Sequence, residues 1–405
     1  MRIDFTRNYD IVVVGGGIAG VSAAIAASEG GAKVALVEKS AWFGGLATGG
    51  MIFFYLPIDD GRGHQVSFGL AEKLLRASVK YGPGMDLDAW KIGQERFRTT
   101  FSPAAFILAL DELLEEAKVE LWLDSWLLGF ESRGGGRVRL LLRNKGGNGA
   151  FTCHCAIDAT GDAELAREAG VPIVQGENDL ALWGLEYDDT SEASTHWSRL
   201  AQGLRGALCG NVPGGKGFPY RALEPRGVTE FLLQSRRWLR SRYAGSTPKE
   251  HRFPLHLPGM ADFRTAARIV GRTVVPTDAH NRFLADSIGL AADWSSVGTV
   301  QEIPFSALLP QDGPDCLIVA GRCISAEGYG WELVRSIPAV AVSGEAAGVA
   351  AAYAIRQDIP VGTVPTLAVQ QELSRRGCRL HLSEVGLPCR GEPGYQPSTL
   401  TFETH

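Results

Sequence analysis

The sequence predicts an α/β fold: a Rossmann-like nucleotide-binding domain with a parallel sheet and a β-meander, joined to an α+β substrate domain. Three observations predict it. Residues 9–14 form a short, valine-rich apolar segment, residues 15–20 are rich in glycine and open a helix, and residues 33–37 form a second apolar segment. Short apolar strands that alternate with helices are typical of a parallel sheet buried on both faces.

The first turn has the spacing G-x-G-x-x-G at Gly15, Gly17 and Gly20. Gly15 permits a tight turn, Gly17 lets a pyrophosphate approach the backbone, and Gly20 lets the helix pack closely on the strand. The helix N-terminus at Ile18 and Ala19 supplies unpaired N–H groups and partial positive charge. This spacing also occurs in unrelated turns, so the residues that follow must decide.

An acid ends the second strand. Glu38 occupies the position where this fingerprint needs a carboxylate for the ribose hydroxyls, and Lys39 follows it. Because a carboxylate repels a 2′-phosphate, we expect FAD or NAD rather than NADP. The strand, the glycines, the helix and the acid together predict a dinucleotide site.

A glycine pair then follows in residues 39–50, which read KSAWFGGLATGG. This run resembles the FAD-dependent oxidoreductases of the glutathione reductase structural type, in which a Gly-Gly loop lies near the flavin and the pyrophosphate. The resemblance implies an FAD cofactor contacted by five loop residues, which are Gly44, Gly45, Leu46, Ala47 and Thr48. A pure NAD dehydrogenase has no reason to carry that loop.

Two later segments match the same group. Ala159, Thr160 and Gly161 resemble its Ala-Thr-Gly motif, where a strand turns under the cofactor. Gly321 ends a strand that the resemblance places beside the ribityl chain and the pyrophosphate. Arg322 replaces the more usual acid after that glycine, so a carboxylate contact to the ribityl chain is not assumed, although Arg322 stays among the expected cofactor contacts.

The segments at 263–271 and 322–325 narrow the resemblance to a widespread branch of mostly uncharacterised FAD-dependent oxidoreductases. The similarity runs from about residue 9 to about residue 354, and the middle third is the least similar part. Its motifs are specific for FAD and not for a substrate.

Composition limits the class of protein. The chain has 405 residues, a formal charge of −5 and no long basic run, which argues against nucleic acid as a partner. The first residues lack the apolar core of a secretory signal, and no apolar run approaches the roughly 18 residues that cross a bilayer. We therefore expect a cytoplasmic protein with no membrane span.

The seven cysteines lack the spacing of a disulfide scaffold, so reduced thiols are expected. Cys153, His154 and Cys155 could suggest a metal, but no second ligand pair lies nearby in the sequence, and we expect no metal site. The paired catalytic cysteines of disulfide reductases are absent.

Helical spacing, caps and turn residues predict the remaining elements of the first part. Helices are expected over 18–30, 67–81 and 102–117, a third parallel strand over 119–123, a hairpin of 126–132 with 136–143, and a strand over 151–157. These elements and the glycine turns form the expected FAD-binding domain over residues 1–175.

The composition changes after that point, because tryptophan, histidine, arginine and proline increase. Residues 176–299 are the expected substrate-facing domain, and their arginine-rich helix at 235–243 is either a solvated face or a basic partner patch. Residues 300–360 return to the FAD-binding domain with a strand at 316–320 and a helix from Pro338. Residues 361–405 form a C-terminal extension.

The resemblance places the N-terminus of that last helix at the flavin, with Ser336, Ile337 and Val340 closest. A helix N-terminus stabilises negative charge beside it. Tyr329, Glu332 and Arg335 come just before the helix and are the candidate catalytic residues: Tyr329 and Arg335 as substrate contacts, and Glu332 as a base. The other candidate base is Glu327, and the histidines that could face a cleft are His64, His196, His256 and His280.

Arg268 could anchor a substrate carboxylate through bidentate hydrogen bonds, or it could form an interdomain salt bridge. The expected activity is hydride transfer between FAD and a small organic substrate, of the dehydrogenase or oxidase type. A monooxygenase, an ene-type reductase and a non-catalytic flavin-binding redox protein are the alternatives.

No second nucleotide fingerprint occurs in the sequence, so electrons are expected to leave to oxygen, a quinone or a partner protein, unless NAD(P)H binds transiently. Homodimerisation is plausible for this fold. Covalent attachment of FAD through His64 or a cysteine has no supporting motif.

Overall fold

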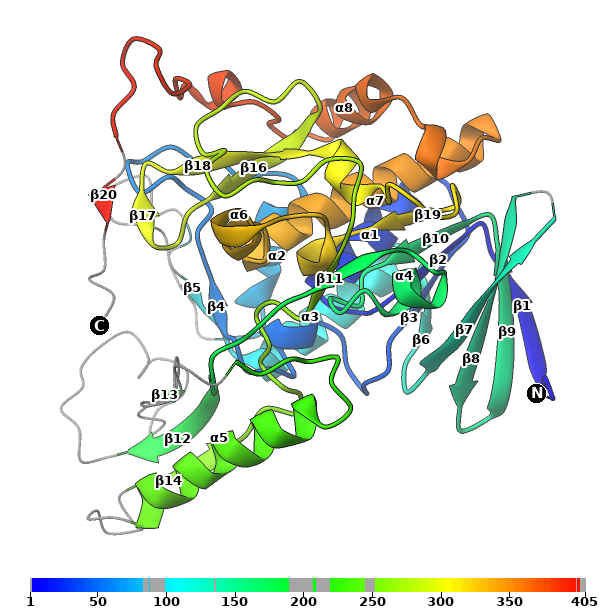
Figure 1. Cartoon of the computed structure of the whole chain (residues 1–405), viewed down its shortest axis with the longest axis horizontal. Helices are drawn as coiled ribbons and strands as arrows, with labels where there is room; N and C mark the ends of the chain where they lie inside the picture. Colours follow the sequence, from blue (N-terminus) through cyan, green and yellow to red (C-terminus); the bar gives the residue numbers. More distant parts are fainter. Residues whose placement is uncertain are drawn as a thin grey trace.

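The structure is a computed structural model that describes residues 2–82, 87, 99–134, 136–188, 207–208, 219–244, 252–397 and 399–400. It confirms the predicted mixed α/β class, with a parallel sheet and a β-meander (Figure 1). His196 lies outside the described residues. The predicted domain boundaries remain a prediction.

The central sheet has five parallel strands in the order β19-β10-β2-β3-β6. Four of them are buried along their whole length, as continuous apolar strands of a covered parallel sheet are. The strands are β2 (Ile11–Val14), β3 (Val34–Val37), β6 (Glu120–Trp122), β10 (Cys155–Asp158) and β19 (Leu317–Val319). The carboxyl ends of β2 and β10 meet at the edge where the glycine turn lies.

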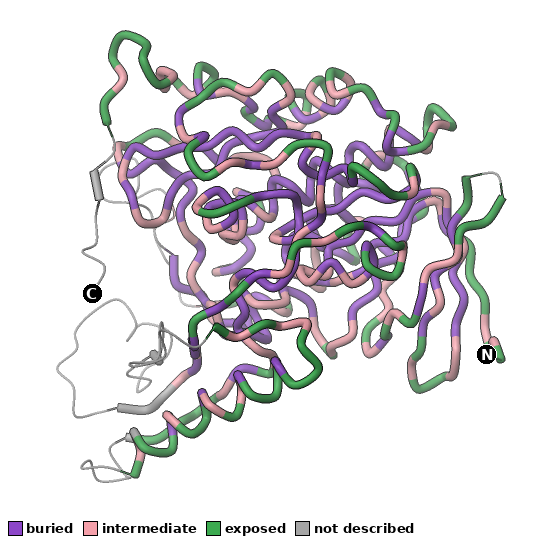
Figure 2. The backbone as a smooth tube through the Cα atoms, in the orientation of Figure 1, coloured by how far each residue is buried: buried purple, intermediate pink, exposed green. Residues whose placement is uncertain are grey.

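Two long helices, α1 (Ile18–Glu29) and α7 (Ile337–Gln357), run together in the core beside this sheet (Figure 2). A Cβ added at Gly344 would overlap the Ala19 carbonyl oxygen, and one at Gly348 would overlap the Ala23 carbonyl oxygen. Small residues therefore let the two backbones touch.

These contacts also fix the direction of α7. Gly344 meets Ala19 and Gly348 meets Ala23, so the two helices run parallel. Ala19 is the second residue of α1, whereas Gly344 is the eighth of α7. At about 1.5 Å per residue, the N-terminus of α7 extends about 9 Å beyond that of α1.

The meander is a four-stranded sheet in the order β1-β9-β8-β7, which includes the predicted hairpin of β7 (Trp126–Arg133) and β8 (Arg137–Asn144). The predicted strand over 151–157 is split into β9 (Gly147–Cys153) and β10, which belong to different sheets. The Asp10 carbonyl accepts from the amides of both His154 and Cys155, and this holds the break. An unpredicted polar strand, β1 (Phe5–Asn8), pairs with β9.

Further helices cover the sheet and its flanks. The predicted cap is present at α3, where the Ser102 hydroxyl accepts from the Ala105 amide and Pro103 opens the helix. The predicted helix over 67–81 is shorter. The helices are α2 (Leu70–Ser78), α3 (Pro103–Glu116), α4 (Glu164–Glu168), α6 (Gly328–Val334) and α8 (Thr366–Arg375).

The middle of the chain forms short antiparallel sheets and α5 (Gly227–Ala244), which is longer than the predicted 235–243. Phe231 and Leu239 of α5 pack with Phe263 in a small apolar cluster, so this helix has an apolar stripe. The strand pairs are β4 (Phe54–Tyr55) with β5 (Thr99–Thr100), β11 (Ile173–Gln175) with β15 (Ala267–Ile269), β12 (Gly184–Asp188) with β13 (Ala207–Leu208) and β14 (Arg252–His256), β16 (Ser287–Ala292) with β18 (Val300–Pro304), and β17 (Ser296–Val297) with β20 (Thr399–Leu400).

Helix α7 has the length and hydropathy of a membrane-spanning segment, the one such helix among the described residues. In the most apolar stretch of α7, 83% is buried inside the protein. Its apolar composition is therefore accounted for by packing on α1, the sheet and the neighbouring helices.

The α1–α7 contact gives a stability prediction. We expect Gly344→Ala to lower the free energy of unfolding by about 1–3 kcal/mol, because overpacking forces the helices apart and outweighs the helix propensity that alanine gains. Urea denaturation measures the change. Gly134→Ala is the matched control, since a Cβ there meets nothing within 4 Å. A Gly344→Ala variant as stable as the parent would contradict the packing argument.

Candidate dinucleotide and substrate site

The glycine turn after β2 is built on steric limits. Gly15 has φ +99°, and a Cβ there would lie 2.5 Å from the Ala159 carbonyl oxygen. A Cβ at Gly20 would overlap the Gly15 carbonyl oxygen. Both glycines are therefore needed to bring the N-terminus of α1 against β10, whether or not a ligand is bound.

Gly17 differs from both, because a Cβ there would meet no protein atom within 4 Å. The second glycine loop lies beside it: the Gly44 amide donates to the Gly16 carbonyl at 2.8 Å, and a Cβ at Gly45 would lie 3.0 Å from the Gly17 Cα. No side chain caps α1. Open space next to uncapped N–H groups is what a diphosphate requires.

Glu38 is buried at the end of β3, with 8% of its surface exposed. Its Oε2 accepts from the Gly16 amide at 2.6 Å, and its Oε1 accepts from the amide and the hydroxyl of Ser40, each at 2.7 Å. A carboxylate has about four acceptor positions, so these bonds orient Glu38 and leave capacity for ribose hydroxyls. Lys39 donates to Glu164 at 2.6 Å.

The threonines of the two later loops use their hydroxyls on the protein itself. Thr48 donates to the Phe43 carbonyl at 2.7 Å, and Thr160 donates to Asp158 Oδ1 at 2.7 Å. The Thr160 hydroxyl also accepts from the Glu164 amide. Leu46 and Ala47 lie in a short 3-10 turn after Gly45. Contacts from these loops to a cofactor would therefore come mainly from the backbone.

The turn after β19 brings three segments together through Arg322. Its guanidinium donates to the Gly161 carbonyl at 2.8 Å, to the Phe263 carbonyl at 2.7 Å and to Asp162 Oδ1 at 2.6 Å. The side chain is 11% exposed. The expected contact of Arg322 with the cofactor stays a prediction. In the structure, its guanidinium joins the Ala-Thr-Gly loop to the middle of the chain. Gly321, with φ +83°, packs against Ala19.

Helix α7 also begins without a side-chain cap, at Ser336. Ile337 and Val340 are half-buried, and Pro338 has no N–H to satisfy. This N-terminus is free to face a ligand in the way that the resemblance implies. Just before it, Arg335 Nε donates to Glu332 Oε2 at 2.8 Å, so these two candidate residues form an ion pair.

Tyr329 lies on α6 within a polar network that sequence reasoning missed. Its hydroxyl donates to Asp293 Oδ2 at 2.6 Å and also bonds the Ser295 hydroxyl. Asp293 is 2% exposed, and its Oδ1 accepts from the Ser295 amide. The Asp-x-Ser sequence after β16 is typical of a turn and could have been recognised. Its contact with Tyr329 could not, because the two residues are 36 positions apart in the sequence.

Arg268 is half-buried on β15, with its guanidinium 5.8 Å from the centroid of the Trp331 ring. Its Nη1 donates to the Ile269 carbonyl at 3.3 Å, and its buried Nε has no partner among the described residues. Within that part of the chain no acid pairs with it. Of the two roles expected for Arg268, the substrate contact therefore remains the proposal.

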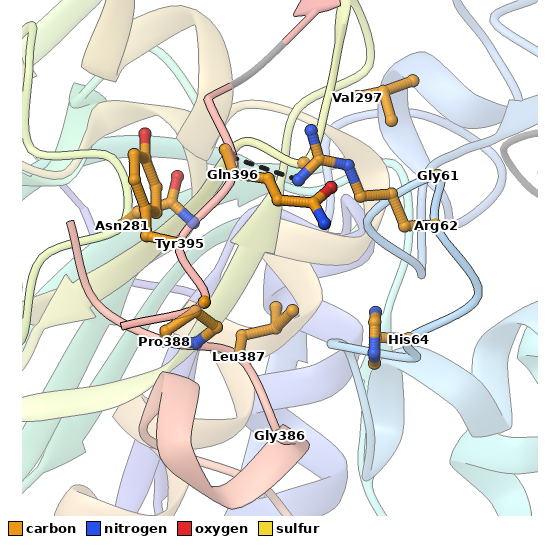
Figure 3. A pocket seen from close by; sticks show the side chains of 12 residues that line it. Gly61, Arg62, His64, Asn281, Val297, Gly386, Leu387, Pro388, Tyr395 and Gln396 are labelled. Carbon is orange, nitrogen blue, oxygen red and sulfur yellow. Dashed lines mark hydrogen bonds between the residues drawn. The ribbon is translucent and has the colours of Figure 1, made fainter. Parts of the chain in front are cut away.

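His64 lies elsewhere, in a cavity of about 570 Å³ beside the C-terminal extension (Figure 3). Its Nδ1 is 3.0 Å from the buried Asp60 carboxylate. Arg62 spans the cavity and donates to the Gln396 carbonyl at 3.2 Å. None of the lining residues belongs to the glycine loops. His256 lies on β14, and burial lowers the pKa of His280.

The sequence analysis also missed Asp262, although this residue directly precedes the segment at 263–271. It is 3% exposed, and its Oδ2 accepts from the Trp183 amide at 3.2 Å. Its buried Oδ1 has no hydrogen-bond partner within the described part of the chain. Burial raises the pKa of this carboxyl well above its usual range.

Five of the six described cysteines are buried, and Cys389 is partly exposed. Cys153 and Cys155 flank the break between β9 and β10, and burial raises the pKa of both thiols. In the described ranges, no group of three or more His, Cys, Asp or Glu side chains is arranged to hold a metal.

The family described as FAD dependent oxidoreductase matches residues 10–191 and 260–373 of the chain. These two stretches contain both glycine loops, the Ala-Thr-Gly turn, Arg322 and the start of α7. The chain matches no curated protein.

Solved structures resemble the chain in fold. The p-nitrophenol 4-monooxygenase PnpA from Pseudomonas putida DLL-E4 has a TM-score of 0.51 at 13% identity, over 91% of this chain and 84% of that one. A geranylgeranyl bacteriochlorophyll reductase-like protein from Thermoplasma acidophilum has a TM-score of 0.49 at 16% identity, over 92% of this chain and 83% of that one. At these identities the likeness concerns the fold alone.

The open cradle at Gly17 gives a binding prediction. We expect Gly17→Ala to leave the unfolding of the ligand-free protein almost unchanged, because the methyl group meets no protein atom, and to weaken FAD binding at least about tenfold. Fluorescence titration with FAD measures the affinity. Unchanged affinity in Gly17→Ala would mean that the diphosphate does not lie at this turn.

The buried Asp262 gives a pH prediction. The folded state keeps this carboxyl protonated above the unfolded pKa of about 3.9, so stability that it contributes in acid is lost as the pH rises. Relative to Asp262→Asn, which cannot ionise, the parent protein should lose free energy of unfolding between pH 4 and pH 8. Denaturant titrations across that range measure the difference, and parallel curves for the two proteins would contradict the raised pKa.

Proposed function

The chain belongs to the FAD-dependent oxidoreductase family, and on that basis we propose that this enzyme transfers hydride between FAD and a small organic substrate, as a dehydrogenase or an oxidase. One observation carries the proposal: the uncapped N-termini of α1 and α7 lie at the same end of the sheet, with Tyr329 on the helix just before α7. When bound, FAD supplies the chemistry of hydride transfer.

Different residues would bind the diphosphate, the ribose and the ring system of the cofactor. The N–H groups of Ile18 and Ala19 would bind the diphosphate in the space at Gly17, and Glu38 would accept from the ribose hydroxyls. The N-terminus of α7, about 9 Å further along, would face the ring system. A helix N-terminus there favours negative charge by roughly 1–2 kcal/mol when partly buried.

Tyr329 is the proposed proton-transfer residue. Oxidation of an alcohol or amine requires a group that takes a proton from the heteroatom. The Tyr329 hydroxyl would take that proton while it passes its own proton to the buried Asp293 carboxylate, to which it donates at 2.6 Å. Glu332 is the weaker candidate, because its carboxylate is already paired with Arg335. In this proposal, Glu332 and Arg335 support the wall of the site, and Arg268 contacts the substrate.

The electron acceptor, which would be oxygen, a quinone or a partner protein, belongs to the same proposal. A monooxygenase is the alternative, and the presence in the product of an oxygen atom derived from O₂ would identify it. Anaerobic reaction of the FAD-loaded enzyme with alcohols, amines and enoates separates the classes: a dehydrogenase substrate bleaches flavin absorbance without oxygen and without NAD(P)H.

The role of Tyr329 gives a kinetic prediction. With a substrate that bleaches the flavin, Tyr329→Phe should slow bleaching by about 10²- to 10⁴-fold at unchanged FAD content, because the proton acceptor is lost. Stopped-flow absorbance measures the rate. Tyr353→Phe on α7 is the matched control, since that ring contacts Arg356 far along the helix. Equal rates in both variants would exclude Tyr329 from proton transfer.

A further inference from the structure

One short segment of the middle region is fastened to the cofactor-binding loops at two points. The Gly259 amide donates to the Gly49 carbonyl at 2.8 Å, just after the Gly44-Gly45 pair. Four residues later, the Phe263 carbonyl accepts from Arg322 at 2.7 Å. Residues 259–264 therefore line the side of the dinucleotide site that faces the middle of the chain.

Arg264 ends this segment with an unpaired guanidinium. The backbone amide of Arg264 donates to Asn178 Oδ1, but its side chain has no hydrogen bond or ion pair with any described residue. The residue is half-buried, and burial together with the charge of Arg335 lowers its pKa. An arginine stays charged in proteins, so a partly desolvated guanidinium without an acceptor is costly until an anion binds it.

The charges around Arg264 indicate the charge of that anion. The charge of Arg335 acts on Arg264, but Arg335 itself forms an ion pair with Glu332. Asp262 lies two residues before Arg264 and forms no ion pair with any described residue. Its buried Oδ1 has no hydrogen-bond partner among them. The negative charges of Glu332, Asp179 and Asp262 also act on Arg264, but among the described residues none of these acids forms an ion pair with it, and together they would repel a dianion. This arrangement matches a single negative charge better than a dianion.

We propose that Arg264 binds the carboxylate of an organic-acid substrate and that Asp262 Oδ1 makes the second contact. Planar guanidinium and carboxylate groups form two parallel hydrogen bonds. Arg264 is close enough to Arg335 for their charges to interact, and Arg335 directly precedes Ser336 at the N-terminus of α7, so the bound carboxylate would lie near that helix end. The assignment rests on the proposed function, since it requires the substrate to lie beside that helix. Arg268 lies four positions further along the chain, on β15, and keeps its proposed substrate contact.

The test uses the full-length FAD-loaded enzyme and the flavin absorbance spectrum. Benzoate, phenylacetate and butyrate are the probes, with benzamide as the neutral control and inorganic sulfate as the dianion control. We expect at least one carboxylate to perturb the spectrum, with a Kd at least about tenfold higher in Arg264→Gln and an intermediate Kd in Arg264→Lys. Arg272→Gln is the matched control, because Arg272 donates to the Gly362 carbonyl outside this site.

Equal carboxylate affinity in the parent and Arg264→Gln would overturn the proposal. So would a flavin spectrum that no carboxylate perturbs, or one that benzamide or sulfate perturbs as strongly as the carboxylates do. Should Arg264→Gln lose FAD, phenylglyoxal modification of the parent followed by peptide mapping decides instead: a bound carboxylate must protect Arg264. Carboxylate binding that depends on Arg264 with no bleaching by any substrate would uphold the site and contradict the hydride-transfer function.

Discussion

The close contact between α1 and α7 is the constraint on which the site depends. Gly344 and Gly348 let α7 lie against the carbonyl oxygens of Ala19 and Ala23, and Gly20 lets α1 lie against the turn at Gly15. Any side chain larger than hydrogen at these points would move a helix N-terminus. Because the helices run parallel, their two positive ends are presented at one edge of the sheet, separated along the axis by about 9 Å. That spacing suits a ligand with an anionic middle and a second polar group further along.

Arg322 connects this cofactor-binding frame to the rest of the chain. By bonding Gly161, Asp162 and Phe263 it joins segments 161 and 59 positions away in sequence. Charge-assisted hydrogen bonds of a buried guanidinium are among the stronger polar contacts in proteins. The acid that the resemblance leads one to expect at this position would reach a cofactor, whereas the arginine bonds the Ala-Thr-Gly loop to the segment that contains Phe263. Asp262 and Arg264 owe their location to this tie.

Local patterns carried much of the fold. The apolar strands, the G-x-G-x-x-G turn, the Ser102-Pro103 cap and the Gly44-Gly45 loop are short-range signals, and each predicted element is found. The break at His154 was not predictable, since the apolar run continues across it and only pairing with distant strands separates β9 from β10. The polar strand β1 and the full length of α5 were missed for the same reason, because tertiary pairing and packing decide them. The network of Tyr329 with Asp293 depends on contacts that no sequence spacing records. The same holds for Asp262 Oδ1 and the Arg264 guanidinium, which have no hydrogen-bond partner in the described part of the chain.

A crystal structure of the enzyme with FAD would show whether the two helix N-termini hold the cofactor. We predict that the diphosphate lies in the open space over Gly17 at the N-terminus of α1, and that the isoalloxazine ring lies at the N-terminus of α7, with its substrate side facing residues 259–264. Density for the diphosphate at any other part of the chain, or a ring that points away from Ser336 and Ile337, would contradict it.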